Sequence, residues 1–162
     1  MQPKLVTDAA TSARMKRIRQ RDTNPELLFR RWLWNRGIRF TTSNRDLPGS
    51  PDLANRTRRW AVFVHGCFWH GHRGCIRFRI PKRNAEFWRE KIKKNIQRDH
   101  RKNDELAALG FHILTVWECE VANLQNCDPR QARRLVTTLR SRGRLSDLQS
   151  RPGPLPQTRL GH

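Results

Sequence analysis

The sequence has few acidic residues, and it lacks long apolar runs and internal repeats. Asp and Glu number 14 against 34 Lys and Arg, which gives a formal net charge of +20 and a pI of about 11.6. That imbalance argues against an enzyme of neutral metabolites and favours a polyanionic partner. No run of about eighteen apolar residues is present to span a bilayer, and the N-terminus lacks the apolar core of a signal peptide. We therefore expect a cytoplasmic protein without a membrane partner.

Aromatic residues are plentiful where acidic ones are scarce. Six Trp and seven Phe are interleaved with the basic residues, and flat rings among cations suit base stacking combined with phosphate contact. The alternative is a solvated basic surface around a core of ordinary aromatic side chains. Four cysteines in a chain without a secretion signal are more typical of thiols or metal ligands than of disulfides. We predict a nucleic-acid-binding protein.

The domain organisation follows from length and composition. A chain of 162 residues, 36% of them apolar, is long enough for one domain with one core. Residues 1–21 are predicted to form a basic arm that becomes ordered on its target, and the arm includes Lys16, Arg17 and Arg19. Residues 22–145 are predicted to form the folded domain, and residues 146–162 a disordered tail.

Hydrophobic periodicity predicts an α/β fold with a mixed sheet flanked by helices. Helices are expected at about 25–36, at 84–109 and within 123–142. Strands are expected at 60–65 and 111–117. A short strand should also follow Asp52, and another could begin at 38–40. Strand 60–65, the long helix and strand 111–117 make a βαβ unit, so the two strands should be parallel with a right-handed crossover. Parallel strands end on the same side of a sheet, and this brings Cys67 and Cys119 together.

The stretch from Val64 to Cys75 is the chemical centre of the chain, with three histidines and two cysteines in twelve residues. Cys67, Cys75 and Cys119 with one histidine, either His72 or His70, suit a tetrahedral structural zinc site. Such a site would hold a glycine-containing loop rigid. The alternative is a set of ordinary buried thiols with His72 at the surface. Cys127 is left over as a small apolar side chain.

A second cation site is predicted where a short hairpin folds back. A hairpin turning about Thr57 places Asp52 opposite residues 63–65. A carboxylate, the Val64 carbonyl and His65 would then lie close together and suit Mg²⁺, which takes oxygen ligands and keeps several waters. The alternative for Asp52 is a cap or turn residue.

Three further side chains are candidates for acid–base chemistry. His70 lies beside the predicted zinc loop and is a candidate general base for a water attacking phosphorus, or else an exposed loop residue. Asp99 interrupts the apolar side of the long helix, where it either orients that imidazole or makes a salt bridge. Glu26 is explained by helix-start electrostatics alone.

Three aromatic residues are candidates for contact with bases. Phe68 and Trp69 lie in the predicted fixed loop, and Trp88 lies in the first turns of the long helix. Such rings can wedge between base pairs at a cost of a few kcal/mol, least where pairing is already imperfect. Core packing is the alternative, and it is the default for Trp88.

Several segments together resemble one family, the very-short-patch-repair (Vsr) DNA mismatch endonucleases. The resemblance extends over roughly residues 12–121, and the His-Gly-Cys-Phe-Trp-His run at 65–70 is its most specific part. The segments that carry it are Leu47-Pro48-Gly49-x-Pro51-Asp52, Phe63-x-His65-Gly66-Cys67-Phe68-Trp69-His70, Glu86-Phe87-Trp88-x-x-Lys91-Ile92-x-x-Asn95, Arg98-Asp99 and Val116-Trp117-Glu118-Cys119.

The resemblance implies a restriction-endonuclease-like fold with a structural zinc, and Mg²⁺-dependent nicking 5′ to the T of a T:G mismatch in double-stranded DNA. Such a mismatch is left when 5-methylcytosine deaminates. The resemblance also implies kinship with enzymes that work beside a cytosine methyltransferase and mismatch-repair factors.

Residue roles follow from the resemblance position by position. It implies that Asp52 binds the metal, that His70 is the catalytic histidine, that His65 and Asp99 support it, and that Glu26 is a helix-borne active-site carboxylate. The zinc set would be Cys67, His72, Cys75 and Cys119. The wedge would be Phe68, Trp69 and Trp88, and the DNA-gripping arm would carry Lys16, Arg17 and Arg19.

The sequence departs from the family pattern at two places. Val64 stands where some members have Thr, which leaves only the backbone carbonyl for the metal. The Cys67–Cys75 loop is one residue longer than usual, which bears on the identity of the zinc histidine. The predicted function is a mismatch-nicking DNA endonuclease; its rivals are a non-catalytic zinc-containing DNA-binding protein and a restriction endonuclease that cuts both strands.

Overall fold

The computed structural model describes residues 22–141, which form an α/β fold around a small mixed sheet. The strand order is β1-β2-β3, with β1 antiparallel and β3 parallel to the central strand. The elements are α2 (Asn24–Trp34), β1 (Leu53–Asn55), β2 (Trp60–His65), α3 (Ala85–Ala108), β3 (His112–Trp117), α4 (Glu118–Ala122), the 3-10 turn η1 (Leu124–Asn126) and α5 (Pro129–Arg140).

The predicted βαβ unit is confirmed. Strand β2 pairs in parallel with β3, and the register sets Trp60 beside His112 and His65 beside Trp117. Both strands therefore end at the same edge of the sheet, and the residues that follow them lie side by side. The hairpin prediction also holds, because Leu53 pairs with Val62 and Asp52 lies one residue before that pair.

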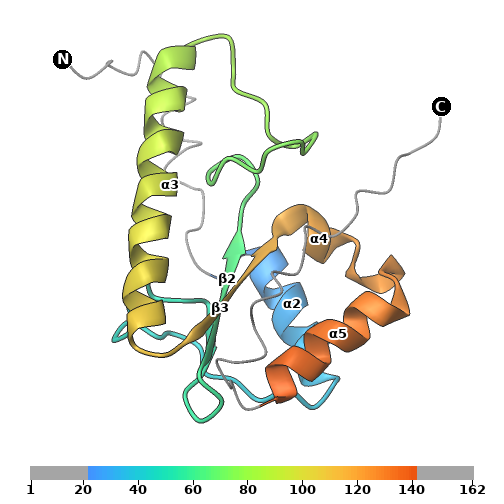
Figure 1. The fold of residues 1–162 in the computed structure, drawn as a ribbon. Helices are drawn as coiled ribbons and strands as arrows, with labels where there is room; N and C mark the ends of the chain where they lie inside the picture. Colours follow the sequence, from blue (N-terminus) through green and yellow to red (C-terminus); the bar gives the residue numbers. More distant parts are fainter. Residues whose placement is uncertain (1–21, 142–162) are drawn as a thin grey trace.

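Helices cover the two faces of the sheet unequally. Figure 1 shows α3 alone on one side and α2, α4 and α5 on the other. The larger core lies on the three-helix side and includes Phe29, Leu33, Trp60, Val62 and Leu139. The smaller core under α3 contains Ala61, Phe63, Leu106 and Phe111. Alternation of side chains along β2 explains how one strand supplies both cores.

Helix α5 is tied to the sheet by a polar contact as well as by packing. The indole Nε1 of Trp60 donates a hydrogen bond of 2.9 Å to the carbonyl of Leu139, and both residues are buried. Because a buried indole N–H needs an acceptor, this bond fixes where the end of α5 crosses the strand. The predicted basic helix within 123–142 is thus confirmed as α5, with shorter bounds.

One predicted strand is absent from the described residues. Residues 38–40 form no strand, and the segment makes a single bridge at Thr41, which exchanges backbone hydrogen bonds of 2.8 and 3.0 Å with Ala54. The loop after Thr41 turns away from the sheet because the side chain of Asn44 ties its two ends together. The Asn44 amide donates hydrogen bonds to the carbonyls of Thr41 and Pro51. The apolar residues 38 and 40 pack on the core without a ladder.

The predicted arm at residues 1–21, with Lys16, Arg17 and Arg19, and the predicted tail at 146–162 lie outside the described residues. Within residues 22–141, no helix combines the length and apolar character needed to cross a membrane.

Candidate active site and metal centre

The loop after β2 and the end of β3 bring three thiols and an imidazole together. The donor atoms of Cys67, His72, Cys75 and Cys119 all lie within 4.8 Å of one another. The Nδ1 of His72 is 3.4 Å from the Sγ of Cys67 and 3.4 Å from the Sγ of Cys119. The parallel register explains this, because Cys67 and Cys119 each follow the end of neighbouring strands.

This donor set fits zinc. Tetrahedral Zn²⁺ with thiolate and imidazole bonds of about 2.0–2.3 Å needs its ligand atoms roughly 3.3–3.8 Å apart, and the two distances from His72 to the cysteine sulfurs fall within that range. Burial, as the largest cause, raises the pKa of both Cys67 and Cys119. Those two thiols therefore keep their protons unless a bound metal cation displaces the protons. His72, not His70, is the imidazole in the group.

A glycine lets the Cys67–Cys75 loop pack closely against α3. Gly71 has φ +67° and lies against α3, where an added Cβ would meet Ile96 Cδ1 at 2.9 Å and Ile92 Cγ2 at 3.1 Å. Only a residue without a side chain tolerates both that conformation and that approach. Glu118 fixes the start of the loop by accepting the Cys67 amide at 3.1 Å.

A second group of donors lies between the loop and α3. His70 Nδ1 and Asp99 Oδ2 are 2.5 Å apart, and the rings of His65 and His70 stack with centroids 3.8 Å apart. Burial opposes charge on Asp99, but the hydrogen bond and charge of His70 outweigh it and lower the pKa of Asp99. Burial, helped by the neighbouring His70, lowers the pKa of His65 to about 3.

These shifts bear on how the hydrogen bond is made. Ionised Asp99 is an acceptor only, so Nδ1 of His70 is the donor in their bond, and Nε2 is the ring nitrogen outside that bond. His65 stays neutral under the His70 ring near neutral pH. The alternative reading of Asp99 as an arginine salt bridge is secondary, since the Arg98 contact is 3.8 Å long.

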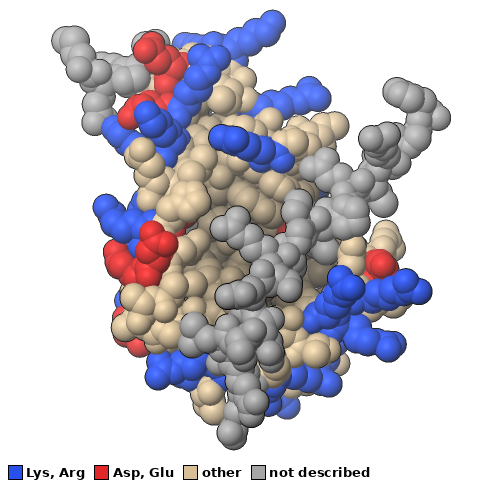
Figure 2. Space-filling view, in the orientation of Figure 1, with Lys and Arg blue, Asp and Glu red and all other residues tan. Residues whose placement is uncertain are grey.

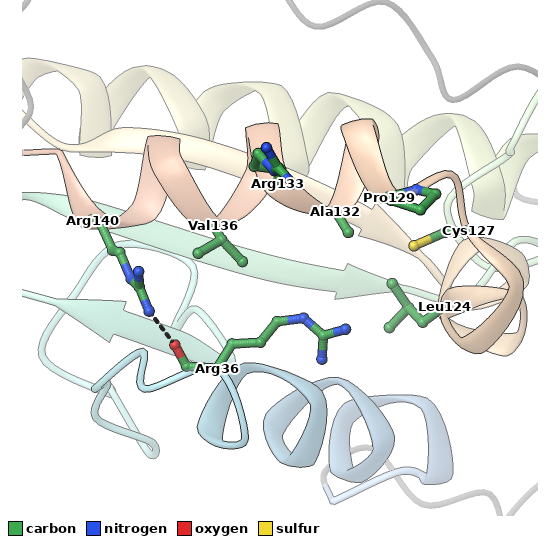
Figure 3. A pocket seen from close by; sticks show the side chains of 8 residues that line it. All are labelled: Arg36, Leu124, Cys127, Pro129, Ala132, Arg133, Val136 and Arg140. Atoms are coloured by element: carbon green, nitrogen blue, oxygen red, sulfur yellow. Dashed lines mark hydrogen bonds between the residues drawn. The ribbon is translucent and has the colours of Figure 1, made fainter.

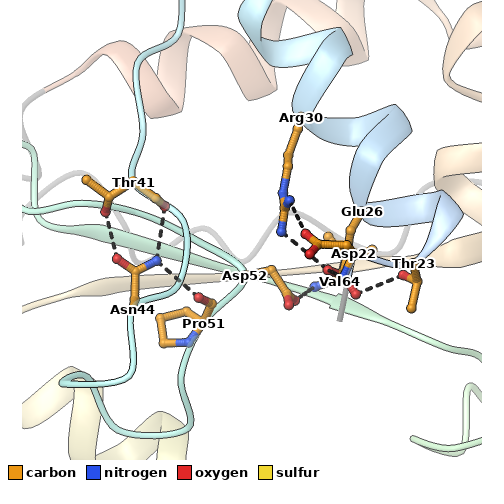
Figure 4. A network of polar contacts seen from close by, with 9 residues as sticks. All are labelled: Asp22, Thr23, Glu26, Arg30, Thr41, Asn44, Pro51, Asp52 and Val64. Atoms are coloured by element: carbon orange, nitrogen blue, oxygen red, sulfur yellow. Dashed lines mark hydrogen bonds and ion pairs between the residues drawn. The ribbon is translucent and has the colours of Figure 1, made fainter. Parts of the chain in front are cut away.

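Asp52 lies across the β1–β2 hairpin from the end of β2. Its Oδ2 accepts the Val64 amide at 2.7 Å, so the carboxylate is held at the end of the strand (Figure 4). Burial, as the largest cause, raises the pKa of Asp52 from 3.8 to about 6, and the negative charge of Glu26 adds to the shift. Buried carboxylates side by side favour a bound cation.

Glu26 is a buried residue at the start of α2, 4% exposed. Its two carboxylate oxygens accept the Asp22 amide at 2.9 Å and the Thr23 hydroxyl at 2.8 Å, and Arg30 lies 3.4 Å away. These are helix-start contacts, as the sequence indicates. Its influence on Asp52 is what sequence reasoning alone did not supply.

Asn44 supports the loop that carries Asp52. It is 1% exposed, and its amide donates to the Pro51 carbonyl at 3.1 Å, while its carbonyl oxygen accepts the Thr41 hydroxyl at 2.6 Å (Figure 4). Arg56 reinforces the loop through Asn44 Oδ1 at 3.1 Å and through Asp46. Nothing in the spacing of the sequence singles out Asn44.

Trp117 joins the two groups of donors. Its ring stacks on His72 with centroids 4.1 Å apart and meets the edge of His65 at 5.6 Å. The register that pairs His65 with Trp117 accounts for this position. The sequence placed Trp117 in a family segment but gave it no role.

Three aromatic side chains cluster beside the same loop. Phe68, Trp69 and Trp88 make edge-to-face contacts with centroids 5.2–5.8 Å apart. Trp88 is 8% exposed and forms the base of the cluster, while Phe68 and Trp69 are half-buried. Asn95 on α3 holds the loop by donating to the Trp69 carbonyl at 2.9 Å.

Comparison with known proteins supports one family. The model of the DNA mismatch endonuclease Vsr family matches residues 4–77. The chain is 40% identical over 129 residues to the Type II nicking enzyme V.NmeAIP of Neisseria meningitidis, covering 77% of this chain and 91% of that enzyme. It is 43% identical over 116 residues to the Type II nicking enzyme V.XorIIP of Xanthomonas oryzae, covering 72% of this chain and 85% of that enzyme.

A third relative is the DNA mismatch endonuclease Vsr of Escherichia coli, 44% identical over 115 residues that cover 70% of this chain and 73% of that enzyme. Relatives of this identity and coverage decide between an endonuclease and a non-catalytic DNA-binding protein. The chain belongs to the Vsr family of DNA mismatch endonucleases, and it is an endonuclease whose substrate is DNA.

Proposed function

We propose that the enzyme nicks one strand of double-stranded DNA 5′ to the T of a T:G mismatch, as the first step in very short patch repair of deaminated 5-methylcytosine. The family and the activities of its relatives, a mismatch endonuclease and nicking enzymes, support single-strand cutting. A double-strand restriction enzyme remains the rival that the assay below separates. We place the enzyme in the cytoplasm with its DNA substrate, and mismatch-repair factors are a candidate class of partner.

We assign the catalytic cation site to Asp52 and the Val64 carbonyl. The donors are oxygen atoms, as Mg²⁺ prefers, and the raised pKa of Asp52 reflects a buried carboxylate that a cation would stabilise. Bound there, Mg²⁺ supplies a positive charge that polarises the scissile phosphate and stabilises the leaving 3′ oxygen. Glu26 adds negative charge beside Asp52.

His70 acts as the general base. Its Nδ1 donates to Asp99, so its Nε2 is the atom that takes a proton from the attacking water. Asp99 holds the imidazole in that tautomer and stabilises the positive charge that the ring gains. His65, neutral and stacked on His70, fixes the plane of the ring without adding a competing charge.

The zinc site is structural. Three thiolates and the His72 imidazole would supply all four ligands of a tetrahedral zinc ion, which would leave no position for water or substrate. Cys67, His72, Cys75 and Cys119 therefore hold the loop on which His70, Phe68 and Trp69 lie.

Mismatch selection is assigned to the aromatic cluster. Phe68 and Trp69 would enter the stack beside the T:G pair, where unstacking costs least, and Trp88 would back them. Lys16, Arg17 and Arg19 of the predicted arm would contact the backbone phosphates and fix the register of the duplex.

The observation that carries the proposal is the fixed carboxylate of Asp52 at the end of β2, beside the His70–Asp99 pair. A strand-specific nicking assay tests it, with matched, T:G and other mismatched duplexes labelled on each strand. We expect one Mg²⁺-dependent cut, 5′ to the T of the T:G pair. Equal cutting of both strands in matched and mismatched duplexes would overturn the proposal.

A further inference from the structure

A groove lined by arginines lies between α2 and α5, away from the residues assigned to catalysis. Its volume is about 470 Å³. Figure 3 shows Arg36 and Arg140 entering from its two sides, with Ala132 and Val136 of α5 facing the space between. The described residues that line it include Arg133 as a third guanidinium but no carboxylate.

Two of the three arginines are held in place. The Arg36 guanidinium lies 3.8 Å from the Trp32 ring centroid, and its Nη1 donates to the Trp32 carbonyl at 3.2 Å. The Nη2 of Arg140 donates to the Arg36 carbonyl at 2.6 Å (Figure 3). Neither arginine has an acidic partner in residues 22–141, and the same is true of the exposed Arg133. Three cations placed together without an anion favour an anionic ligand.

The rest of the chain is poorly suited to supply that anion. Residues 1–21 contain six basic residues and one acidic residue, and residues 142–162 contain four basic residues and one acidic residue. Either segment would add positive charge to the groove. Asp128, which precedes the groove-lining Pro129, caps α5 by accepting the Arg130 amide at 2.9 Å. The ligand is therefore expected to come from outside the chain.

The lining favours a sugar–phosphate backbone over a bare anion. Guanidinium groups pair with phosphate oxygens, and the apolar wall of Leu124, Pro129 and Val136 matches the apolar face of a deoxyribose. The enzyme already acts on DNA. Figure 2 shows basic side chains gathered in the region of α5.

We propose that the groove between α2 and α5 is a second DNA-backbone contact, distinct from the catalytic site. Glu26 at the start of α2 lies near Asp52, whereas Arg36 follows its end. The eleven residues of α2 span about 16 Å. The groove thus binds backbone that the active site does not reach, and it adds affinity without adding sequence or mismatch selectivity.

Charge reversal tests the proposal with a matched control on the same helix. Arg133→Glu alters the groove, whereas Arg134→Glu makes the same change on an exposed residue that does not line it. Binding is measured by fluorescence anisotropy in Mg²⁺-free buffer, over a range of salt, on a matched duplex about three helical turns long. The matched duplex separates this test from mismatch recognition.

We expect Arg133→Glu to weaken DNA binding about fivefold more than Arg134→Glu does. The slope of log K against log salt concentration should also fall further in Arg133→Glu, by about the amount that one phosphate contact contributes. Nicking at saturating enzyme should stay unchanged in the control Arg134→Glu. Equal effects of the two substitutions on DNA affinity would overturn the proposal. The proposal would also be overturned if the groove bound an acidic peptide and Arg133→Glu left DNA affinity unchanged. Unchanged thermal unfolding checks that each variant folds.

Cys127 provides a direct readout inside the groove. It lines the groove and is outside the group of four metal-binding donors. We expect the matched duplex to slow maleimide labelling of Cys127, followed by peptide mass spectrometry, and Arg133→Glu to remove that protection. Labelling at the same rate with and without DNA would contradict a backbone bound in the groove.

Discussion

The four cysteine and histidine donors and the Asp52 carboxylate differ in what their burial does. Cys67, His72, Cys75 and Cys119 face one another at mutual distances that suit a closed shell. Asp52 instead is buried with a raised pKa and with the charge of Glu26 nearby. Under the proposed function, bound zinc would stabilise the fold through the first group, whereas the buried charge of Asp52 would cost stability until Mg²⁺ or substrate arrives. Trp117 contacts His72 of the first group and His65 at the end of β2.

The largest contrast is expected from Asp52→Asn. The amide keeps an acceptor for the Val64 N–H but loses the negative charge that holds Mg²⁺. We expect nicking of a T:G duplex to fall by about 10³-fold or more, measured under single-turnover conditions. Full zinc content should remain. A variant that nicks at the normal rate would remove Asp52 from the mechanism.

The same variant should be more stable without Mg²⁺. The pKa of Asp52 is raised in the folded protein, so its charge above pH 6 opposes folding by on the order of 2 kcal/mol. The stability advantage of Asp52→Asn should therefore be full at pH 8 and shrink as the pH falls toward 4. Urea unfolding at both pH values measures it. Low-pH effects of His65 occur in both proteins and cancel in the difference.

Cys119→Ser tests the cysteine and histidine donors in the same way. Removing one thiolate opens the zinc shell, and we expect loss of zinc together with at least about 3 kcal/mol of stability. Zinc content by atomic absorption and unfolding by urea give the two readings. Cys127→Ser is the matched control, since Cys127 is outside the donor group. A Cys119→Ser protein with full zinc and normal stability would contradict a structural site.

Proton competition at Asp52 gives a smaller, graded effect. At limiting Mg²⁺, nicking should decline about tenfold for each pH unit below about 6, because protonated Asp52 cannot bind the cation. Raising the Mg²⁺ concentration should move the midpoint to lower pH. A midpoint that does not respond to Mg²⁺ would assign the ionisation to another group.

Asn44→Ala should have the smallest effect. It tests whether the loop that carries Asp52 contributes to the catalytic cation site. Losing the bonds to Pro51 and Thr41 loosens the loop that carries Asp52, so we expect a few-fold rise in the Mg²⁺ concentration needed for nicking and a loss of about 1–3 kcal/mol in stability. The control is Asn55→Ala, which removes an exposed bond to the Arg39 carbonyl. Equal Mg²⁺ dependence in both variants would leave Asn44 a purely structural role.

The sequence predicted those features that depend on local pattern. Apolar runs predicted strand 60–65 with the observed bounds, and parallel ends of strands predicted that Cys67 and Cys119 would meet. A turn placed at Thr57 predicted that Asp52 would lie opposite the end of strand 60–65, as observed. Asp99 stood out because a carboxylate interrupted an apolar stripe of α3, and it contacts His70, as the orienting alternative requires; its role in the reaction stays a prediction.

Other features depend on contacts between distant segments and were not predictable. Burial of Glu26 near Asp52 requires α2 to pack against the end of β2. Asn44 acts through a loop whose path no periodicity encodes, and the predicted strand at 38–40 was wrong for the same reason. The arginine groove joins residues about a hundred positions apart, Arg36 and Arg140.

A Mn²⁺ soak of zinc-loaded crystals, with anomalous diffraction at both metal edges, tests the central claim most directly, because His65, His70 and Asp99 also lie within 4.8 Å of one another and offer a competing place for a cation. We predict zinc at the four cysteine and histidine donors and Mn²⁺ at the Asp52 carboxylate and Val64 carbonyl. Mn²⁺ bound between His65, His70 and Asp99, with none at Asp52, would contradict the separation of a structural zinc site from a carboxylate-bound catalytic metal.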